Sequence, residues 1–139
     1  MNPHLPAGHD AIFTANQIVA HLVGDYLLQS DWMAREKHRR LDAAALHVFF
    51  YTLPFVFITQ EPVALALIAV LHLVVDHFGV ARYLAWLKNR PWPGSLPWAE
   101  CRKTGFPPDM PVWQSSWLLV IIDNTLHILT NGIVLHYFG

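Results

Sequence analysis

Four long apolar runs dominate this sequence and restrict the folds open to it. They cover residues 11–30, 41–59, 62–87 and 112–138. Each run is close to the roughly 20 residues with which an α-helix crosses a bilayer. Only 14% of the residues are charged, whereas about 25% is usual in soluble domains. We therefore expect an all-α fold, an integral membrane four-helix bundle that forms one domain over residues 1–139.

A segment rich in proline and tryptophan separates the third and fourth apolar runs. It covers residues 90–111 and includes the stretches RPWPGSLPW and FPPDMP. Proline lacks a backbone N–H and interrupts helices, so we predict an ordered surface loop here. By the same argument Pro54 should kink the second helix, whereas Pro62 suits the first position of the third.

All lysines and arginines lie in two segments of the chain. Four join the first and second apolar runs, and five lie at the end of the third run or in the loop after it. They are Arg35, Lys37, Arg39, Arg40, Arg82, Lys88, Arg90, Arg102 and Lys103. With four spans these segments face one side, which the positive-inside rule makes cytoplasmic, so both termini are predicted on the non-cytoplasmic side. The net charge of −1 gives no reason to expect a nucleic-acid partner.

Three of the apolar runs contain a histidine and an aspartate four residues apart. The pairs are His21 with Asp25, His72 with Asp76, and Asp123 with His127. Residues four apart share one face of an α-helix. Ionisable groups in apolar helices are costly unless they pair or bind something. We therefore expect the three pairs to meet in one buried polar centre.

Metal binding is the simplest use for such a centre. The predicted ligands are the six paired residues, His21, Asp25, His72, Asp76, Asp123 and His127. Imidazole and carboxylate together suit a divalent metal, zinc first, with manganese or iron as alternatives. His47 stands alone in the second run, and we predict His47 and Asp123 as the catalytic residues. A metal with an open position turns bound water into a nucleophile, so the leading function is hydrolysis of a phosphate-containing or membrane-associated substrate.

Two other classes of function stay open on the sequence. A buried His/Asp network also fixes helix packing, which would suit a small structural subunit of a larger membrane assembly. Chained intramembrane Asp and His residues also relay protons or metal ions. The expected partners are the lipid bilayer and either further copies of the chain or a larger membrane complex.

Three stretches carry a resemblance to a known family. HLVGDYLLQSDWMAREK at residues 21–37, LHVFFYTL at residues 46–53 and HLVVDHF at residues 72–78 resemble the small bacterial and phage proteins catalogued as domain of unknown function 3307. The resemblance covers roughly the first 90 residues. It implies a fold and a membrane location, here the bacterial inner membrane, rather than a reaction.

A weaker likeness links the first motif to metal hydrolases. His21, Gly24, Asp25 and Gln29 are similar to part of the His-Phe-x-Gly-Asp-x-His-Gln-Pro-x-His motif of the zinc-dependent phospholipase C and P1 nuclease group. Leu27 replaces its middle histidine, and the final histidine is missing. The inner-membrane metal-dependent hydrolases also carry His-x-x-x-Asp on apolar helices. These likenesses imply a metal and hydrolysis, with His21 and Asp25 as ligands.

Overall fold

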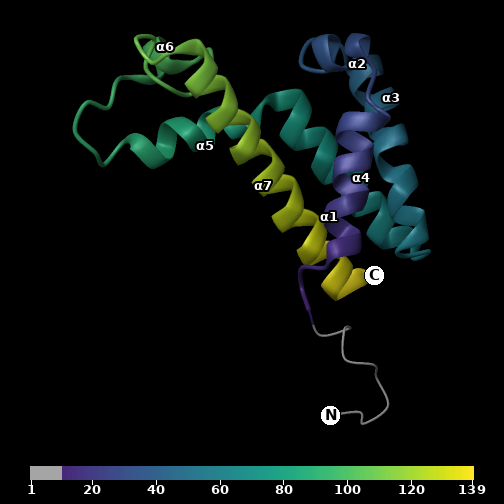
Figure 1. Ribbon diagram of the computed structural model, residues 1–139. Helices are drawn as coiled ribbons and strands as arrows, with labels where there is room; N and C mark the ends of the chain where they lie inside the picture. The colour runs from purple at the N-terminus through teal and green to yellow at the C-terminus, as the bar shows by residue number, and fades with distance from the viewer. Residues whose placement is uncertain (1–10) are drawn as a thin grey trace.

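The computed structural model describes residues 11–139, and these residues are helical with no strand among them (Figure 1). The all-α prediction is therefore confirmed, while residues 1–10 of the predicted domain lie outside the described residues. The elements are α1 (Ala15–Leu22), the π-helical turn η1 (Val23–Leu27), α2 (Asp31–Glu36), α3 (Leu41–Thr52), the 3₁₀ turn η2 (Leu53–Phe57), α4 (Pro62–Phe78), α5 (Val80–Asn89), α6 (Trp98–Cys101) and α7 (Val112–Phe138).

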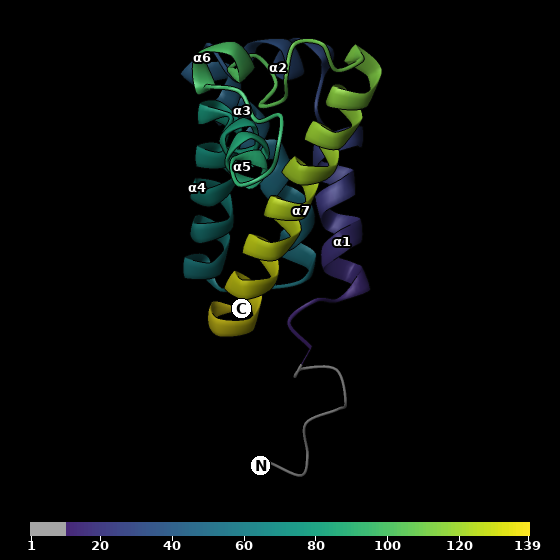
Figure 2. The ribbon, with the colours of Figure 1, turned by 90° about the vertical axis from the view of Figure 1, so that its left-hand side faces the viewer.

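Four helices lie side by side along the long dimension of the molecule. α1 and α4 run toward the end that holds α2 and α6, whereas α3 and α7 run away from it (Figures 1 and 2). α4 packs against both α3 and α7, and α1 packs against α7. Polar side chains on facing sides of these helices can therefore meet in the interior.

The first apolar run changes helix type in the middle. The Thr14 side chain caps α1 by accepting a hydrogen bond from the backbone N–H of Gln17. At η1 the backbone widens, because the N–H of Leu28 donates to the carbonyl of Val23 at 3.0 Å, five residues back. A Cβ at Gly24 would lie 2.6 Å from Cδ2 of Tyr51, so glycine permits the close approach of η1 to α3. Single π turns of this kind are frequent at functional sites.

The second and third runs are both interrupted. α3 tightens into η2, which contains Pro54, so the helix type changes at this proline, while the predicted kink stays a prediction. The third run begins at Pro62 as expected, but the expectation of one helix continuing to residue 87 is wrong. Gly79 ends α4 in the left-handed conformation, with φ 60° and ψ 47°, and α5 leaves at an angle of 66°. Glycine adopts this conformation without the steric cost that a Cβ imposes.

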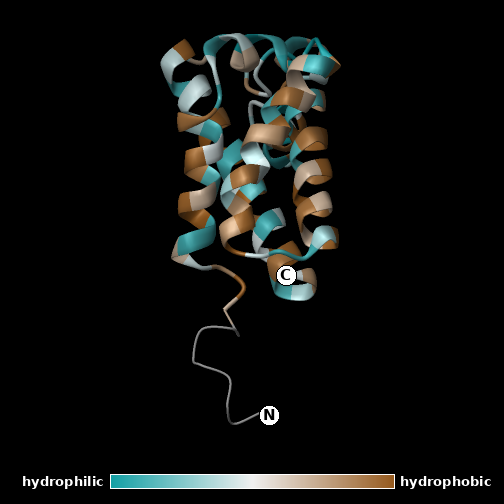
Figure 3. Cartoon of the chain, turned by 90° about the vertical axis from the view of Figure 1, so that its right-hand side faces the viewer, coloured by the Kyte–Doolittle hydropathy of each residue, from teal (hydrophilic) through white to brown (hydrophobic). Residues whose placement is uncertain are grey.

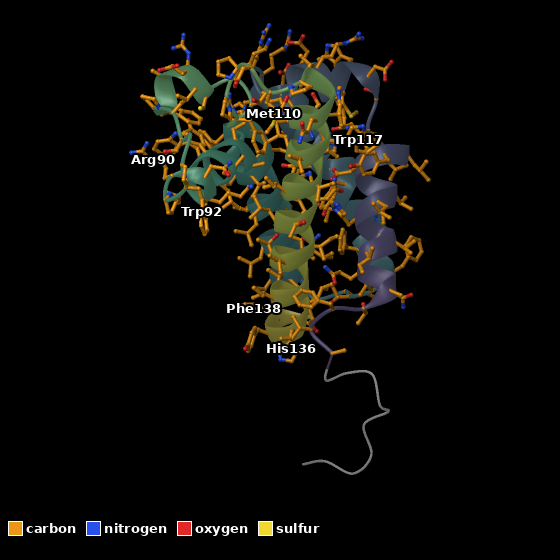
Figure 4. All side chains as sticks on the ribbon, turned by 60° about the vertical axis from the view of Figure 1, so that its left-hand side comes forward. Arg90, Trp92, Met110, Trp117, His136 and Phe138 are labelled. Atoms are coloured by element: carbon orange, nitrogen blue, oxygen red, sulfur yellow. The ribbon has the colours of Figure 1, made fainter. Side chains whose placement is uncertain are left out.

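The segment after α5 is a folded arm rather than an irregular loop throughout. It contains the single helical turn α6, and Trp98 of that turn stacks on Tyr83 of α5 at a centroid distance of 4.4 Å. The indole N–H of Trp86 donates to the carbonyl of Leu96 at 3.0 Å. Arg90 and Trp92 project from this arm, far from Phe138 at the other end of α7 (Figure 4).

Hydrophobic residues recur along the helices (Figure 3), and many large apolar side chains are exposed. Within the described residues, α7 is long and apolar enough to cross a membrane, and α4 with α5 also qualifies if the bent pair is one span. Only 22% of the most apolar α7 stretch is buried, unlike the core helix of a soluble protein. Length and composition thus identify one or two of the four predicted spans.

The buried apolar core lies toward the end opposite α2 and α6. It contains Phe55, Ala64, Ile68 and Val134, packed with Ala20 and the ring of Tyr51. The half of the interior nearer α2 holds most of the buried His and Asp side chains, and with them the predicted site.

Candidate metal centre

Four side chains from three elements converge in the polar half of the interior. Asp25 comes from η1, His47 from α3, and His72 and Asp76 from α4, and all four are buried. One ligand atom from each lies within 4.8 Å of the others. We call this set the inner cluster. The i, i+4 spacing on α4 places both of its residues on one face of that helix, within reach of His47 on α3 and Asp25 on η1.

The distances in the inner cluster match those between the ligands of a small metal ion. Nε2 of His47 lies 2.9 Å from Nε2 of His72 and 3.2 Å from one oxygen of each aspartate. Nε2 of His72 lies 3.4 Å from Oδ1 of Asp25 and 3.0 Å from Oδ2 of Asp76. Ligands about 2.0–2.1 Å from a tetrahedral zinc ion are roughly 3.3 Å apart. The four atoms therefore surround a space of the right size.

One oxygen in the inner cluster has no hydrogen-bond donor. Oδ1 of Asp25 is buried and accepts no hydrogen bond from the described residues, although two imidazole nitrogens are near. Leaving a buried acceptor unsatisfied costs about 1–3 kcal/mol, and more if it is charged. A cation between the four atoms would remove that cost, so the residues fit a metal ion.

A second group shares Asp25 with the inner cluster. Ligand atoms of Asp25, Asp123 and His127 also lie within 4.8 Å of one another, and we call them the cavity cluster. Nε2 of His127 lies 3.5 Å from Oδ2 of Asp123 and 3.2 Å from Oδ1 of Asp76. The Asp123 side chain is 29% exposed, so the cavity cluster is less buried than the inner cluster.

Hydrogen bonds hold the residues around the two clusters. Nδ1 of His21 lies 2.9 Å from the Tyr51 hydroxyl, and Nε2 lies 2.7 Å from Oδ1 of Asn124. The amide of Asn131 donates to the same hydroxyl at 2.6 Å. The Tyr51 ring stacks on His72 at a centroid distance of 3.5 Å. This network orients His21 and places the Tyr51 ring against His72, whereas Nδ1 of His47, His72 and His127 has no hydrogen-bond partner among the described residues.

A lysine from the α2–α3 connection closes the centre at one end. Nζ of Lys37 donates to Oδ2 of Asp76 at 2.7 Å. A hydrogen bond joins Nδ1 of His38 to the Asp76 carbonyl at 2.6 Å, and another joins Nδ1 of His77 to the Lys37 carbonyl at 2.8 Å. Lys37 thus neutralises Asp76, one of the three carboxylates of the two clusters. Divalent cations would balance the remaining negative charge, which is costly to bury unpaired.

A cavity of about 540 Å³ leads to this centre. It lies between η1, the α2–α3 connection, the α4–α5 junction and α7. Asp25, Asp76 and Asp123 line it together with the basic residues Lys37, His38, Arg39, Arg82 and Lys103. The two basic segments of the sequence therefore meet at one end of the molecule. The size is ordinary for a small-molecule site, which takes about 300–1,000 Å³.

The structure brings together six of the seven residues singled out from the sequence. Five of the predicted ligands lie in the two clusters; they are Asp25, His72, Asp76, Asp123 and His127. His47, predicted as catalytic, lies in the inner cluster. His21 borders the clusters, 3.5 Å from Oδ2 of Asp25, with hydrogen-bonding partners at both ring nitrogens. The individual roles stay predictions.

The sequence reasoning missed the basic residues of the site. Lys37, Arg82 and Lys103 counted only as topology signals, because they lie outside the helical His/Asp spacing. Their meeting depends on the bend at Gly79 and on the path of the α2–α3 connection. Gly79 is the one local signal of the bend, and no local pattern in the sequence records the path of the α2–α3 connection.

Comparison with known proteins places the chain in a family. It belongs to the family described as protein of unknown function (DUF3307), whose model matches residues 13–138. The match extends beyond the stretches that suggested it and includes α7 with Asp123 and His127. No curated protein and no solved structure matches the chain, so the likeness to metal hydrolases rests on the residues alone.

Proposed function

We propose that this chain is a membrane-embedded, metal-dependent hydrolase that acts on a phosphate-containing or membrane-associated substrate. The observation that carries the proposal is the inner cluster, where two imidazole nitrogens and two carboxylate oxygens meet within 4.8 Å. Its donors favour zinc, with manganese or iron as alternatives. The adjoining cavity gives a substrate access to the same carboxylates.

The two clusters suit two ions with different tasks. The inner cluster offers four protein ligands, the number that fills a structural zinc site. The cavity cluster offers three, which leaves a position for water or substrate, as in catalytic sites. Asp25 belongs to both and would bridge the ions. His47 then serves as a ligand of the inner ion rather than as the predicted catalytic base.

The chain's own residues divide the remaining work. A divalent ion with an open position supplies water of lowered pKa as the nucleophile. Asp123 faces the cavity from one side of the cavity cluster, where it can accept a proton from that water. Asn124 also lines the cavity, and its amide donates to the Tyr26 hydroxyl at 2.6 Å. That contact keeps Tyr26 at the cavity wall.

The membrane placement is part of the proposal. We propose four spans in the bacterial inner membrane, with the basic end cytoplasmic and both termini on the other side. Large exposed apolar side chains support it, among them Phe57 at 93% and Leu27 at 76% exposure. So does the cavity that Lys37 and Arg39 share with Arg82 and Lys103. A reporter fused after Gly139 should be active only in a non-cytoplasmic compartment; cytoplasmic activity would contradict this topology.

A structural subunit of a larger membrane assembly is the second candidate. The ion pair of Lys37 with Asp76, both largely buried, favours it, because an ammonium partner lowers the cost of the carboxylate without a metal. A proton or ion conduit has less support. The apolar core at Phe55, Ala64, Ile68 and Val134 interrupts the polar chain before the opposite end of the helices.

A hydrolysis assay tests the proposed reaction. Detergent-purified protein should release p-nitrophenol from p-nitrophenyl phosphate, lose this activity with EDTA and regain it with zinc or manganese. Asp123→Asn should lower kcat about a hundredfold or more. Asp109→Asn, in the exposed loop before α7, is the matched control and should match wild type. Activity that survives both EDTA and Asp123→Asn would refute the proposed reaction.

A further inference from the structure

We propose that the basic residues of the cavity form a subsite for the phosphate monoester of a membrane amphiphile. These residues, the basic rim, are Lys37, Arg39, Arg82 and Lys103. The inference rests on the proposed function, since it names the substrate class of the same site. Its support is the meeting of three surfaces in one cavity: acidic floor, basic rim and apolar wall.

Most of the basic rim is available to an anion. Within residues 11–139, carboxylates form ion pairs with Lys37 and Arg40 but not with Arg39, Arg82 or Lys103. Arg82 donates one N–H to the Arg102 carbonyl at 3.2 Å, which aims the guanidinium without neutralising it. Guanidinium and ammonium groups bind phosphate through short, charge-assisted hydrogen bonds. A phosphate held here would lie beside the aspartates of both clusters.

The apolar wall distinguishes an amphiphile from a soluble phosphate ester. Tyr26 of η1 and Leu119 and Val120 of α7 line the same cavity, with Tyr26 54% and Val120 41% exposed. The wall continues onto the outer apolar faces of these elements, where Leu27 and Ile121 are also exposed. A hydrocarbon chain between η1 and α7 would bury this surface, at roughly 25 cal/mol per Å² removed from water.

The reaction on such a substrate is balanced without a further reactant. Water attacks phosphorus and forms a new P–O bond, while the bond from phosphorus to the lipid alcohol oxygen breaks. One proton of the water passes to that oxygen, so the products are the free alcohol and inorganic phosphate. The cavity then has to release one soluble product and one membrane product.

Binding measured by calorimetry tests the subsite independently of hydrolysis. The probes are dioctanoyl phosphatidate and glycerol 3-phosphate, titrated at one salt concentration into detergent-solubilised Asp123→Asn protein, which should not hydrolyse them. Adding Arg82→Gln with Lys103→Gln should weaken phosphatidate binding about tenfold or more. The control adds Arg35→Gln with Arg90→Gln, which makes the same charge change at exposed positions away from the cavity. This control should change the affinity for phosphatidate less than twofold.

The outcomes separate the two proposals. Equal weakening by both pairs of substitutions would overturn the subsite, because only overall charge would matter. Glycerol 3-phosphate binding as tightly as phosphatidate would overturn the amphiphile. Phosphatidate that binds through Arg82 and Lys103 but is not hydrolysed by wild type would support the subsite and contradict only the proposed reaction.

Discussion

The inner cluster and the cavity cluster share Asp25 but differ in what surrounds them. All members of the inner cluster are buried, and they come from η1, α3 and α4. The cavity cluster draws Asp123 and His127 from α7, and the Asp123 side chain is 29% exposed. Closed metal sites stabilise, whereas sites with an open position react. In the proposed function, this difference in burial is the reason for assigning retention of metal to the inner cluster and chemistry to the cavity cluster.

The helices that carry the clusters explain this difference. α4 packs against both α3 and α7, so its pair, His72 and Asp76, is almost completely buried, and only Asp76 borders the cavity. α7 carries the other pair, and only 22% of its apolar stretch is buried. The same i, i+4 spacing therefore gives a closed site on a central helix and an open one on a peripheral helix.

Replacing the shared aspartate should have the largest effect. Asp25→Asn keeps the shape of the side chain but removes the charge common to both clusters, so metal content should fall from about two ions per chain to well under one. The stabilisation that bound metal provides, about 2.7 kcal/mol at a metal concentration 100 times Kd, should disappear. Elemental analysis measures the metal content, and thermal unfolding in detergent measures the loss of stability. Asp42→Asn, which affects an exposed pair with Arg40, should retain the metal; equal loss would contradict a specific role for Asp25.

A change confined to the inner cluster should have an intermediate effect. His47→Gln removes one inner ligand and leaves Asp25, Asp123 and His127 unchanged, so one of about two ions should remain. Glutamine keeps a polar group of similar reach, which limits the cost to the neighbouring carboxylates. Elemental analysis before and after dialysis against a weak chelator would measure the number of ions that each chain retains. Loss of both ions would mean that the clusters are one site, and full retention would remove His47 from the ligands.

The smallest effect on metal is expected next to the clusters. Tyr51→Phe removes the hydroxyl that contacts His21 and accepts from Asn131, and it leaves all proposed ligands in place. Stability should fall by about 1–3 kcal/mol, because buried polar groups lose a partner, while metal content stays the same. Tyr137→Phe, at a position 69% exposed, should change neither quantity in thermal unfolding or elemental analysis. A Tyr51→Phe protein without metal would show that the tyrosine is itself a ligand.

The helical spacing of His and Asp was enough to predict the polar centre but not its division into two clusters. Four-residue spacing places each pair on one face, and burial cost brings such faces together. The sharing of Asp25 depends on η1, and a π turn has no signature in HLVGDYL beyond its glycine. His21 has the same spacing as the ligands, yet Tyr51 and Asn124 occupy its nitrogens. Spacing alone cannot separate a ligand from its neighbour.

The bend after α4 had a signal that apolar composition hid. Gly79 interrupts the run HLVVDHFGVARYL, and a glycine near a helix end is a common stop. Because the residues after it remain partly apolar, the run looked continuous. The bend carries Arg82 to the cavity, so the error in the fold and the missed basic rim have one cause.

X-ray absorption at the zinc edge of the purified, zinc-loaded wild-type protein would identify the ligands of the bound ion. We predict a nearest shell of nitrogen and oxygen only, at about 2.0–2.1 Å, with the outer-shell scattering of about 1.5 imidazoles per zinc, because two ions would share His47, His72 and His127. The Asp25→Asn protein should lose this signal, while the Asp42→Asn protein should keep it. Two results would contradict a metal centre at Asp25, His47, His72 and Asp76. One is a sulfur neighbour at about 2.3 Å, which only the single cysteine, Cys101, could supply. The other is a shell of oxygens without imidazole.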